Sequence, residues 1–324
     1  MDLRGGLFQI ADAHRLDRSA VRRLEQLAGL HSEPAALAVW LPRGVAVLAA
    51  ALGGLGIIFW IAANWQTLGP VGRFALLQGF VLAMCAGALW RPAARAPLGL
   101  LALLAIGALF AYFGQTYQTG ADPWQLFAVW AVLALPLCIA ARSDVLWAPW
   151  ALVVMTGISL WVHAHTGHRW RVQPDDLLVH LFGWVGALML VAALSAPFRR
   201  LTGTGVWALR TAIALAVVMI ASTAIGGLLG SRAELHYALG LAVLAGGGYM
   251  LSRPESFDVF GLSAIALGLD TLLVFGLANL LFRSASHSDG WILALLVVGL
   301  AAAGLVAATV SLLLRLSRRQ GAAR

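Results

Sequence analysis

Polar side chains at the junction between two long apolar runs are the first residues in this sequence that could bind a ligand. The junction, residues 110–130 (FAYFGQTYQTGADPWQLFAVW), carries amide, phenol and carboxylate groups, which donate and accept hydrogen bonds. Residues 64–66 end an earlier apolar run, and we expect both places to lie at one depth on the outer side of a membrane. The candidate site, called the outer cluster, consists of Asn64, Trp65, Gln115, Tyr117, Gln118 and Asp122.

The outer cluster suits an uncharged polar solute or a lipid headgroup, and an ion pair between Arg73 and Asp122 could form part of it. The alternative is an interfacial belt of aromatic residues with helix caps, because Trp and Tyr favour this depth in many membrane proteins. The chemistry of these side chains leaves both interpretations open.

Asp270 is a second candidate, because it lies about halfway along an apolar run at residues 257–282. A charged carboxylate near the centre of a bilayer is costly, so such a group is usually paired, protonated or hydrated. One interpretation is a group that couples transport to a proton or cation. The other is a neutral acid that is hydrogen-bonded to a neighbouring helix. The rarity of intramembrane carboxylates favours the coupling group.

A group of histidines and aspartates follows the fifth apolar run. His-x-His with a further His could bind zinc or copper, but a polar outer loop is the favoured interpretation, and no metal site is predicted. The residues are His163, His165, His168, Asp175, Asp176 and His180. The sequence has no phosphate loop, no HExxH motif and no nucleophile–base pair. We therefore expect no cofactor and no enzymatic activity.

The composition identifies the solvent in which these groups lie. Hydrophobic residues make up 61% of the chain and charged residues only 11%, whereas soluble domains carry roughly 25% charged residues. The mean hydropathy is +0.86, so the lipid bilayer is the expected surrounding. The net charge is +8, but the arginines lie between apolar runs rather than in one patch. We therefore expect no nucleic-acid partner.

The apolar runs predict an all-α, polytopic transmembrane helix bundle with about ten spans, since one span takes about 20 residues. The segment at 235–251 is the least secure, and eight spans with a re-entrant pair is the alternative. The segments are 43–63, 72–90, 98–116, 124–141, 146–164, 177–195, 206–229, 235–251, 257–282 and 291–314.

A polar head at residues 1–42 precedes the first span, and an Arg-rich tail at 315–324 follows the last. Asp17 is predicted to cap an amphipathic helix that runs through about Leu30. This head could rest on anionic lipid, which is the favoured interpretation, or dock a partner protein. The head, the tail and alternate connections hold most of the arginines, so the positive-inside rule places both termini in the cytoplasm.

Residues 57–66 (IIFWIAANWQ), 114–117 (GQTY) and 120–130 (GADPWQLFAVW) together resemble a bacterial family of predicted membrane proteins, domain of unknown function 2157. The resemblance covers roughly residues 10–145. Residues 43–145 are therefore the family-like region, and residues 146–314 hold the remaining spans. The resemblance implies a helical head and supports the outer cluster as a real site, but it implies no substrate. The matched positions are Asn64, Trp65, Gly114, Gln115, Tyr117, Gly120, Asp122 and Trp130.

Two functions from different classes follow for an inner-membrane protein of this kind. The first is a small-solute transporter or permease-like protein, with Asp270 as the coupling group and the outer cluster as a gate or binding site. The second is a non-transporting sensor, scaffold or assembly factor that signals through residues 1–42. The expected partners are the lipid bilayer, a small polar solute or cation, and a protein bound to the head.

Overall fold

The computed structural model describes residues 3–28, 35–64, 69–117, 120–167, 171–229, 234–284 and 288–322. Within these ranges the regular structure is entirely helical, as predicted. The chain divides into two compact units, Met1–Leu52 and Gly53–Arg324, and each unit is described by itself.

The first unit contains α1 (Leu3–Ala13), α2 (Arg18–Leu27) and the beginning of α3 (Ala35–Ala63). The predicted cap of α2 is confirmed, because the Asp17 carboxylate accepts hydrogen bonds from the Ala20 N–H at 2.8 Å and the Ser19 hydroxyl at 2.9 Å. These hydrogen bonds lower the pKa of Asp17, and the bond from the Ala20 N–H has the largest effect. The helix ends at Leu27, three residues before the predicted end.

The boundary predicted at residue 42 between head and first span is not a helix boundary. α3 already begins at Ala35 and continues through Pro42. A proline inside a helix removes one backbone hydrogen bond, but the helix continues on both sides of it in an apolar stretch. The part of α3 with the length and composition of a span begins at Trp40.

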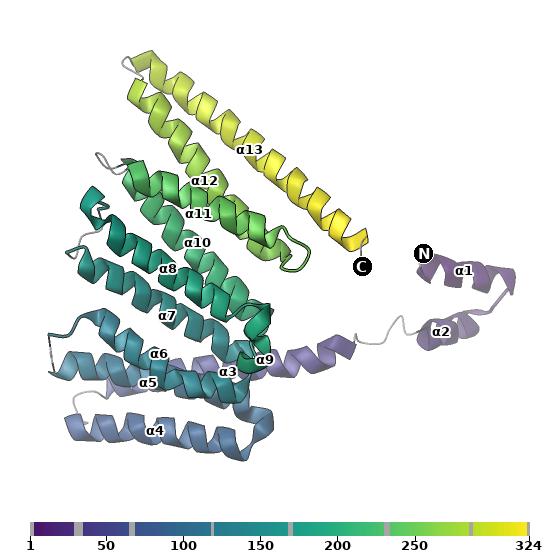
Figure 1. Cartoon of the computed structure of the whole chain (residues 1–324). Helices are drawn as coiled ribbons and strands as arrows, with labels where there is room; N and C mark the ends of the chain where they lie inside the picture. Colours follow the sequence, from purple (N-terminus) through teal and green to yellow (C-terminus); the bar gives the residue numbers. More distant parts are fainter. Residues whose placement is uncertain are drawn as a thin grey trace. The chain divides into compact units, whose positions relative to one another are not determined.

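The second unit holds the remaining long helices, which follow one another in chain order from α4 to α13 (Figure 1). They are α4 (Pro70–Trp90), α5 (Arg95–Tyr117), α6 (Pro123–Ala141), α7 (Asp144–His165), α8 (Leu177–Ala193), α10 (Val206–Leu229), α11 (Glu234–Leu251), α12 (Val259–Ser284) and α13 (Ser288–Ala322). Short turns join them: η1 (Pro92–Ala94), η2 (Pro174–Asp176), η3 (Ala196–Phe198) and α9 (Arg199–Thr202).

Every apolar segment that the sequence predicts as a span is a helix. In the described ranges, nine helices are long and apolar enough to cross a membrane. The exception is α11, whose apolar part, Leu235–Leu251, is shorter. This segment, 235–251, is also the one predicted as the least secure span. The prediction of an all-α polytopic bundle is therefore confirmed.

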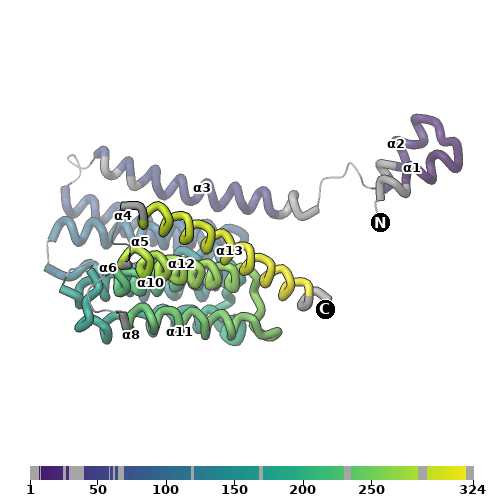
Figure 2. Tube along the Cα trace, turned by 90° about the horizontal axis from the view of Figure 1, so that it is seen from above, coloured from purple at the N-terminus to yellow at the C-terminus, as the bar shows by residue number. Residues whose placement is uncertain are grey.

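The helix α10 is the centre of the second unit. It packs against α7 and α8 on one side and α11 and α12 on the other, and Figure 2 also shows α10 and α12 close together. Ala208, Ala212 and Ala216 repeat every four residues along α10 and are almost fully buried. Small residues at this spacing let helices approach closely where lipid provides no hydrophobic driving force.

Aromatic donors join neighbouring helices through the backbone. The indole N–H of Trp130 in α6 donates to the carbonyl oxygen of Leu103 in α5 at 2.9 Å. The hydroxyl of Tyr237 in α11 donates to the carbonyl oxygen of Leu272 in α12 at 2.8 Å. A polar group buried in a bilayer has no water to bond, so these hydrogen bonds fix the depth of one helix against the next.

Candidate functional site

The outer cluster lies only partly within the described residues, because Trp65 and Gln118 fall outside them. The Asn64 amide, at the end of α3, donates to the carbonyl oxygen of Trp60 in its own helix at 2.9 Å. The Gln115 side chain is exposed and makes no hydrogen bond to the part of the chain that the structure describes. Asp122 occupies the N-cap position of α6 as predicted, although its side chain makes no capping hydrogen bond.

Around Tyr117, the structure brings together aromatic side chains from α4 and α5. The ring centroid of Tyr117 lies 5.0 Å from that of Phe113 and 5.8 Å from that of Phe74. Phe74 also packs 4.7 Å from the buried ring of Tyr112. The Arg73 guanidinium lies over the Tyr112 ring at 5.9 Å, within the distance of a cation–π interaction. This arrangement resembles the interfacial belt more than a set of converging amides.

Asp270 lies near the middle of α12 and is 8% exposed. The hydroxyl of Thr309 in α13 donates to its Oδ1 atom at 3.0 Å. The neighbouring Thr271 hydroxyl bonds the Leu267 carbonyl oxygen of its own helix at 2.7 Å. The carboxyl group therefore lies in the interface between α12 and α13, with a hydroxyl partner from the other helix.

The histidines are grouped differently from the sequence-based expectation. His168 lies outside the described residues. His165 stacks on Trp161 with ring centroids 4.3 Å apart. His180 instead packs edge-on against His236 of α11 at 5.2 Å, and both rings are buried. Among the described residues, no group of three or more His, Cys, Asp or Glu side chains could hold a metal ion.

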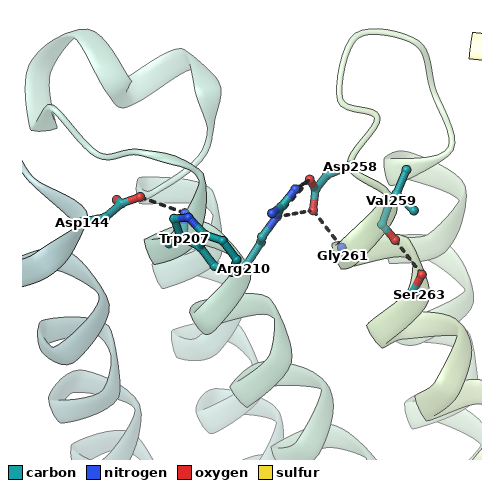
Figure 3. Close-up of polar contacts among 7 residues, drawn as sticks. All are labelled: Asp144, Trp207, Arg210, Asp258, Val259, Gly261 and Ser263. Atoms are coloured by element: carbon teal, nitrogen blue, oxygen red, sulfur yellow. Dashed lines mark hydrogen bonds and ion pairs between the residues drawn. The ribbon is translucent and has the colours of Figure 1, made fainter. Parts of the chain in front are cut away.

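The sequence did not predict a polar network at the starts of three helices, which we call the helix-start network (Figure 3). It consists of Asp144, Gly205, Trp207, Arg210, Asp258 and Gly261. The Asp144 carboxylate, in the first turn of α7, accepts the backbone N–H groups of Gly205 at 2.6 Å and Trp207 at 2.8 Å. It therefore bonds N–H groups at the start of α10, which have no partner inside that helix.

The second half of the helix-start network joins α10 to α12. An Nη2 atom of Arg210 lies 2.7 Å from Oδ1 of Asp258, and the Gly261 N–H donates to Oδ2 at 2.8 Å. Burial by itself would raise the pKa of Asp258, but the hydrogen bonds from Arg210 and Gly261 and the charges of Arg210 and Arg199 lower it overall. Asp258 is therefore an ionised cap of α12 that also pairs with α10.

The signal for this network is present in the sequence. Asp144 and Asp258 stand at the starts of apolar runs, where acidic residues favour the positive end of the helix dipole. Their partners on α10 could not be identified from the sequence, because Asp144 and Gly205 are 61 residues apart. The hydrogen bonds of the network connect the starts of α7, α10 and α12, so the network holds these three helix ends together.

These features define a class: a polytopic, all-α membrane protein with a helical N-terminal unit. Within that class, residues 9–147 match the family described as "Predicted membrane protein (DUF2157)". The match confirms the resemblance predicted over residues 10–145, and it ends in the first turn of α7. No curated protein and no solved structure matches the chain.

Proposed function

We propose that this chain is a permease-like protein of the bacterial inner membrane, which moves a small solute and couples that movement to a proton or cation at Asp270. The observation that supports the proposal is the buried carboxyl group near the middle of α12 with Thr309 as its partner. Intramembrane carboxylates of this kind often lie on ion pathways and proton relays.

The partner of Asp270 suits a group that changes its protonation state. A hydroxyl group can donate a hydrogen bond to a carboxylate and can accept one from a carboxylic acid. The contact between α12 and α13 can therefore persist while the proton is gained or lost. The main neighbour of α13 is α12, so few other contacts oppose a shift of α13 when the hydrogen bond reverses its direction.

The test uses purified protein in liposomes that contain a pH-sensitive dye. Amino acids, sugars, and monovalent and divalent cations are first screened for a rise in melting temperature, because a ligand that binds the folded state stabilises it. Solutes that pass are then tested for proton movement. Asp270→Asn should abolish this movement and keep the abundance and melting temperature of the wild type. Thr271→Val is the matched control, since its hydroxyl bonds only its own helix, and it should behave as wild type.

A structural role for Asp270 gives a different result. Hydrogen bonds between membrane helices contribute about 0.6 kcal/mol on average and at most about 1.7 kcal/mol. If Asp270→Asn and Thr309→Val lower the stability equally, and proton movement per folded molecule is unchanged, then Asp270 only holds α13 in place. The coupling proposal would then be wrong.

A sensor or assembly factor is the second candidate function, and the compact unit Met1–Leu52 favours it. In α2, Leu27 is 83% exposed beside arginines, which suits a surface that docks on lipid or protein. Deleting residues 1–36 separates the two functions. A permease keeps its solute-dependent proton movement without this segment, whereas a sensor stays in the membrane and loses its cellular phenotype.

The proposed orientation has both termini in the cytoplasm. Its support is that arginines lie close together near the starts of α7 and α10. There the Arg142 Nη2 atom donates to the Arg200 carbonyl oxygen at 2.7 Å. The test is cysteine labelling after Cys85 and Cys138 have been replaced. In intact cells, an impermeant maleimide should label Gln115→Cys and spare Glu255→Cys; both side chains are exposed. The reverse pattern would invert the topology.

A further inference from the structure

An open apolar groove of about 520 Å³ lies between α6, α7 and α8 in the second unit. Glycines form part of its wall, and Gly157 comes from α7 while Gly183 and Gly186 come from α8. Because glycine has no side chain, the helix backbone is partly accessible at Gly157 and Gly186, whereas Gly183 is buried. Aromatic rings complete the groove, among them Phe127 of α6 and Phe182 of α8, which is 66% exposed.

The position of the groove limits what can enter it. α6, α7 and α8 all have the length and composition of membrane spans, so the groove opens toward the hydrocarbon of the bilayer. Its volume lies within the roughly 300–1,000 Å³ that is common for ligand sites. A lipid chain has the shape and polarity to fill it, and close contacts with glycine backbone replace looser contacts between lipids.

Trp124 supplies a polar group that can orient a ligand in the groove. It lies in the first turn of α6 and lines the groove. Its indole N–H is buried and has no hydrogen-bond partner in the part of the chain that the structure describes. An indole N–H can only donate, and a buried donor without an acceptor is costly. A ligand that brings an acceptor to this point gains a hydrogen bond that the protein leaves unmade.

The surroundings of Trp124 place that acceptor near the membrane interface. The first turn of α6 is one end of a span, and the Trp124 ring lies 6.3 Å from His165. His165 stacks in turn on Trp161, another residue of the groove. Tryptophan rings favour the depth of the lipid headgroups and ester bonds. An ester carbonyl is an acceptor that occurs at this depth in a phospholipid.

From these observations we infer that the groove is a binding site for a single phospholipid. One acyl chain lies between α6, α7 and α8, and the ester carbonyl of that chain accepts the hydrogen bond of Trp124 Nε1. The site is independent of Asp270, which lies on α12, so its existence does not depend on the proposed transport function.

The test uses the full-length protein in liposomes of phosphatidylethanolamine and phosphatidylglycerol. The probe is a phosphatidylethanolamine with a diazirine midway along one acyl chain, and its ether-linked analogue lacks the carbonyl group. After illumination, labelled peptides are mapped by mass spectrometry. We expect the ester probe to label Phe127 and Phe182 several-fold more than Leu296 and Leu300, which are exposed on α13. The ether probe should label the groove about fivefold less, as the loss of one hydrogen bond predicts.

Variants separate the chain contact from the hydrogen bond. Gly186→Leu places a side chain in the groove and should reduce its labelling to the level of α13. Gly246→Leu is the matched control, because nothing lies within 4 Å of a Cβ there, and its groove labelling should equal wild type. If Gly186→Leu does not fold, Gly186→Ala replaces it, since its Cβ would meet Ile158 at an ordinary 3.5 Å. Trp124→Phe keeps a ring and should abolish the preference for ester over ether.

Three results would overturn the inference. Equal labelling of the groove and of α13 would mean that lipid contacts the groove only as it contacts any apolar surface. An unchanged ester preference in Trp124→Phe would remove the proposed acceptor. A crosslink that joins the grooves of two copies would show that a second chain, and not a lipid, occupies the groove.

Discussion

Replacing Asp144 should loosen the attachment of α10 to α7. In the native protein its carboxylate accepts two backbone N–H groups, from Gly205 and Trp207. Both belong to the start of α10, where the first N–H groups of a helix have no partner within it. The variant Asp144→Ala leaves these donors to water or to the membrane interface and also removes a negative charge from the first turn of α7.

The expected loss can be estimated from these contacts. A hydrogen bond to a charged group contributes about 1.5–3 kcal/mol, and loss of a helix cap costs about 1 kcal/mol on average. Trp207 is exposed, so water can replace part of its bond. We therefore expect Asp144→Ala to lower the free energy of unfolding by about 2 kcal/mol. Asp144→Asn keeps one acceptor oxygen and should lose about half as much.

The assay is equilibrium unfolding of purified protein in mixed micelles, with denaturing detergent as the variable and tryptophan fluorescence as the signal. Asp175→Ala is the matched control, because Asp175 also lies near the start of a helix but is exposed. It should change the free energy by less than about 0.5 kcal/mol. If Asp144→Ala has the same free energy of unfolding as this control, the capping argument is refuted.

A double-mutant cycle checks the geometry of the same contact. A Cβ atom on Gly205 would overlap the Asp144 carboxylate, so Gly205→Ala should displace that group and destabilise the protein by itself. Once Asp144 is alanine, the overlap is removed. The two losses should therefore add to clearly more than the loss of the double variant. Strict additivity would mean that the two residues do not interact.

Two further predictions concern other contacts. Because the pKa of folded Asp258 is lowered, the stability from its pair with Arg210 is complete above the unfolded pKa of about 3.9 and is lost as the pH falls below it. Asp258→Asn should be less stable at neutral pH, and its stability should fall less steeply with decreasing pH than that of the wild type. An equally steep fall in the variant would count against the pair. Gly107→Ala should cost about 1–3 kcal/mol in the same assay, because its Cβ would overlap the Trp130 indole, whereas Gly79→Ala, with nothing within 4 Å of its Cβ, should be neutral or slightly stabilising.

The helices themselves could be predicted from the sequence, because a membrane span requires a long apolar run and each run identifies one helix. Which face of each helix is buried could not be predicted. The helix α5 is apolar all round, since lipid and protein interior favour the same residue types. Nothing in the sequence therefore indicated that Tyr112 is buried while Gln115 is exposed. The outer cluster was predicted from residue type, depth and a family resemblance, and none of these determines which side chains face one another.

Contacts between distant segments were the other missing information. Proximity in the sequence grouped His180 with His163 and His165, but the His180 ring in α8 lies against His236 of α11. Likewise, the pairing of Arg210 with Asp258 could be recognised only once α10 and α12 were known to be neighbours.

The central place of α10 has a consequence for the order of assembly. α4 with α5, and α6 with α7, are neighbours both in the chain and in space, so each pair can form as soon as its second helix is synthesised. The Asp144 carboxylate can bond the Gly205 N–H only after another 61 residues have been synthesised. Until then, α7 carries a charge without its partners, and the faces of α10 on which α8 and α12 will pack do not exist. The insertion of α10 is therefore the step that joins α7 and α8 to the later helices α11 and α12.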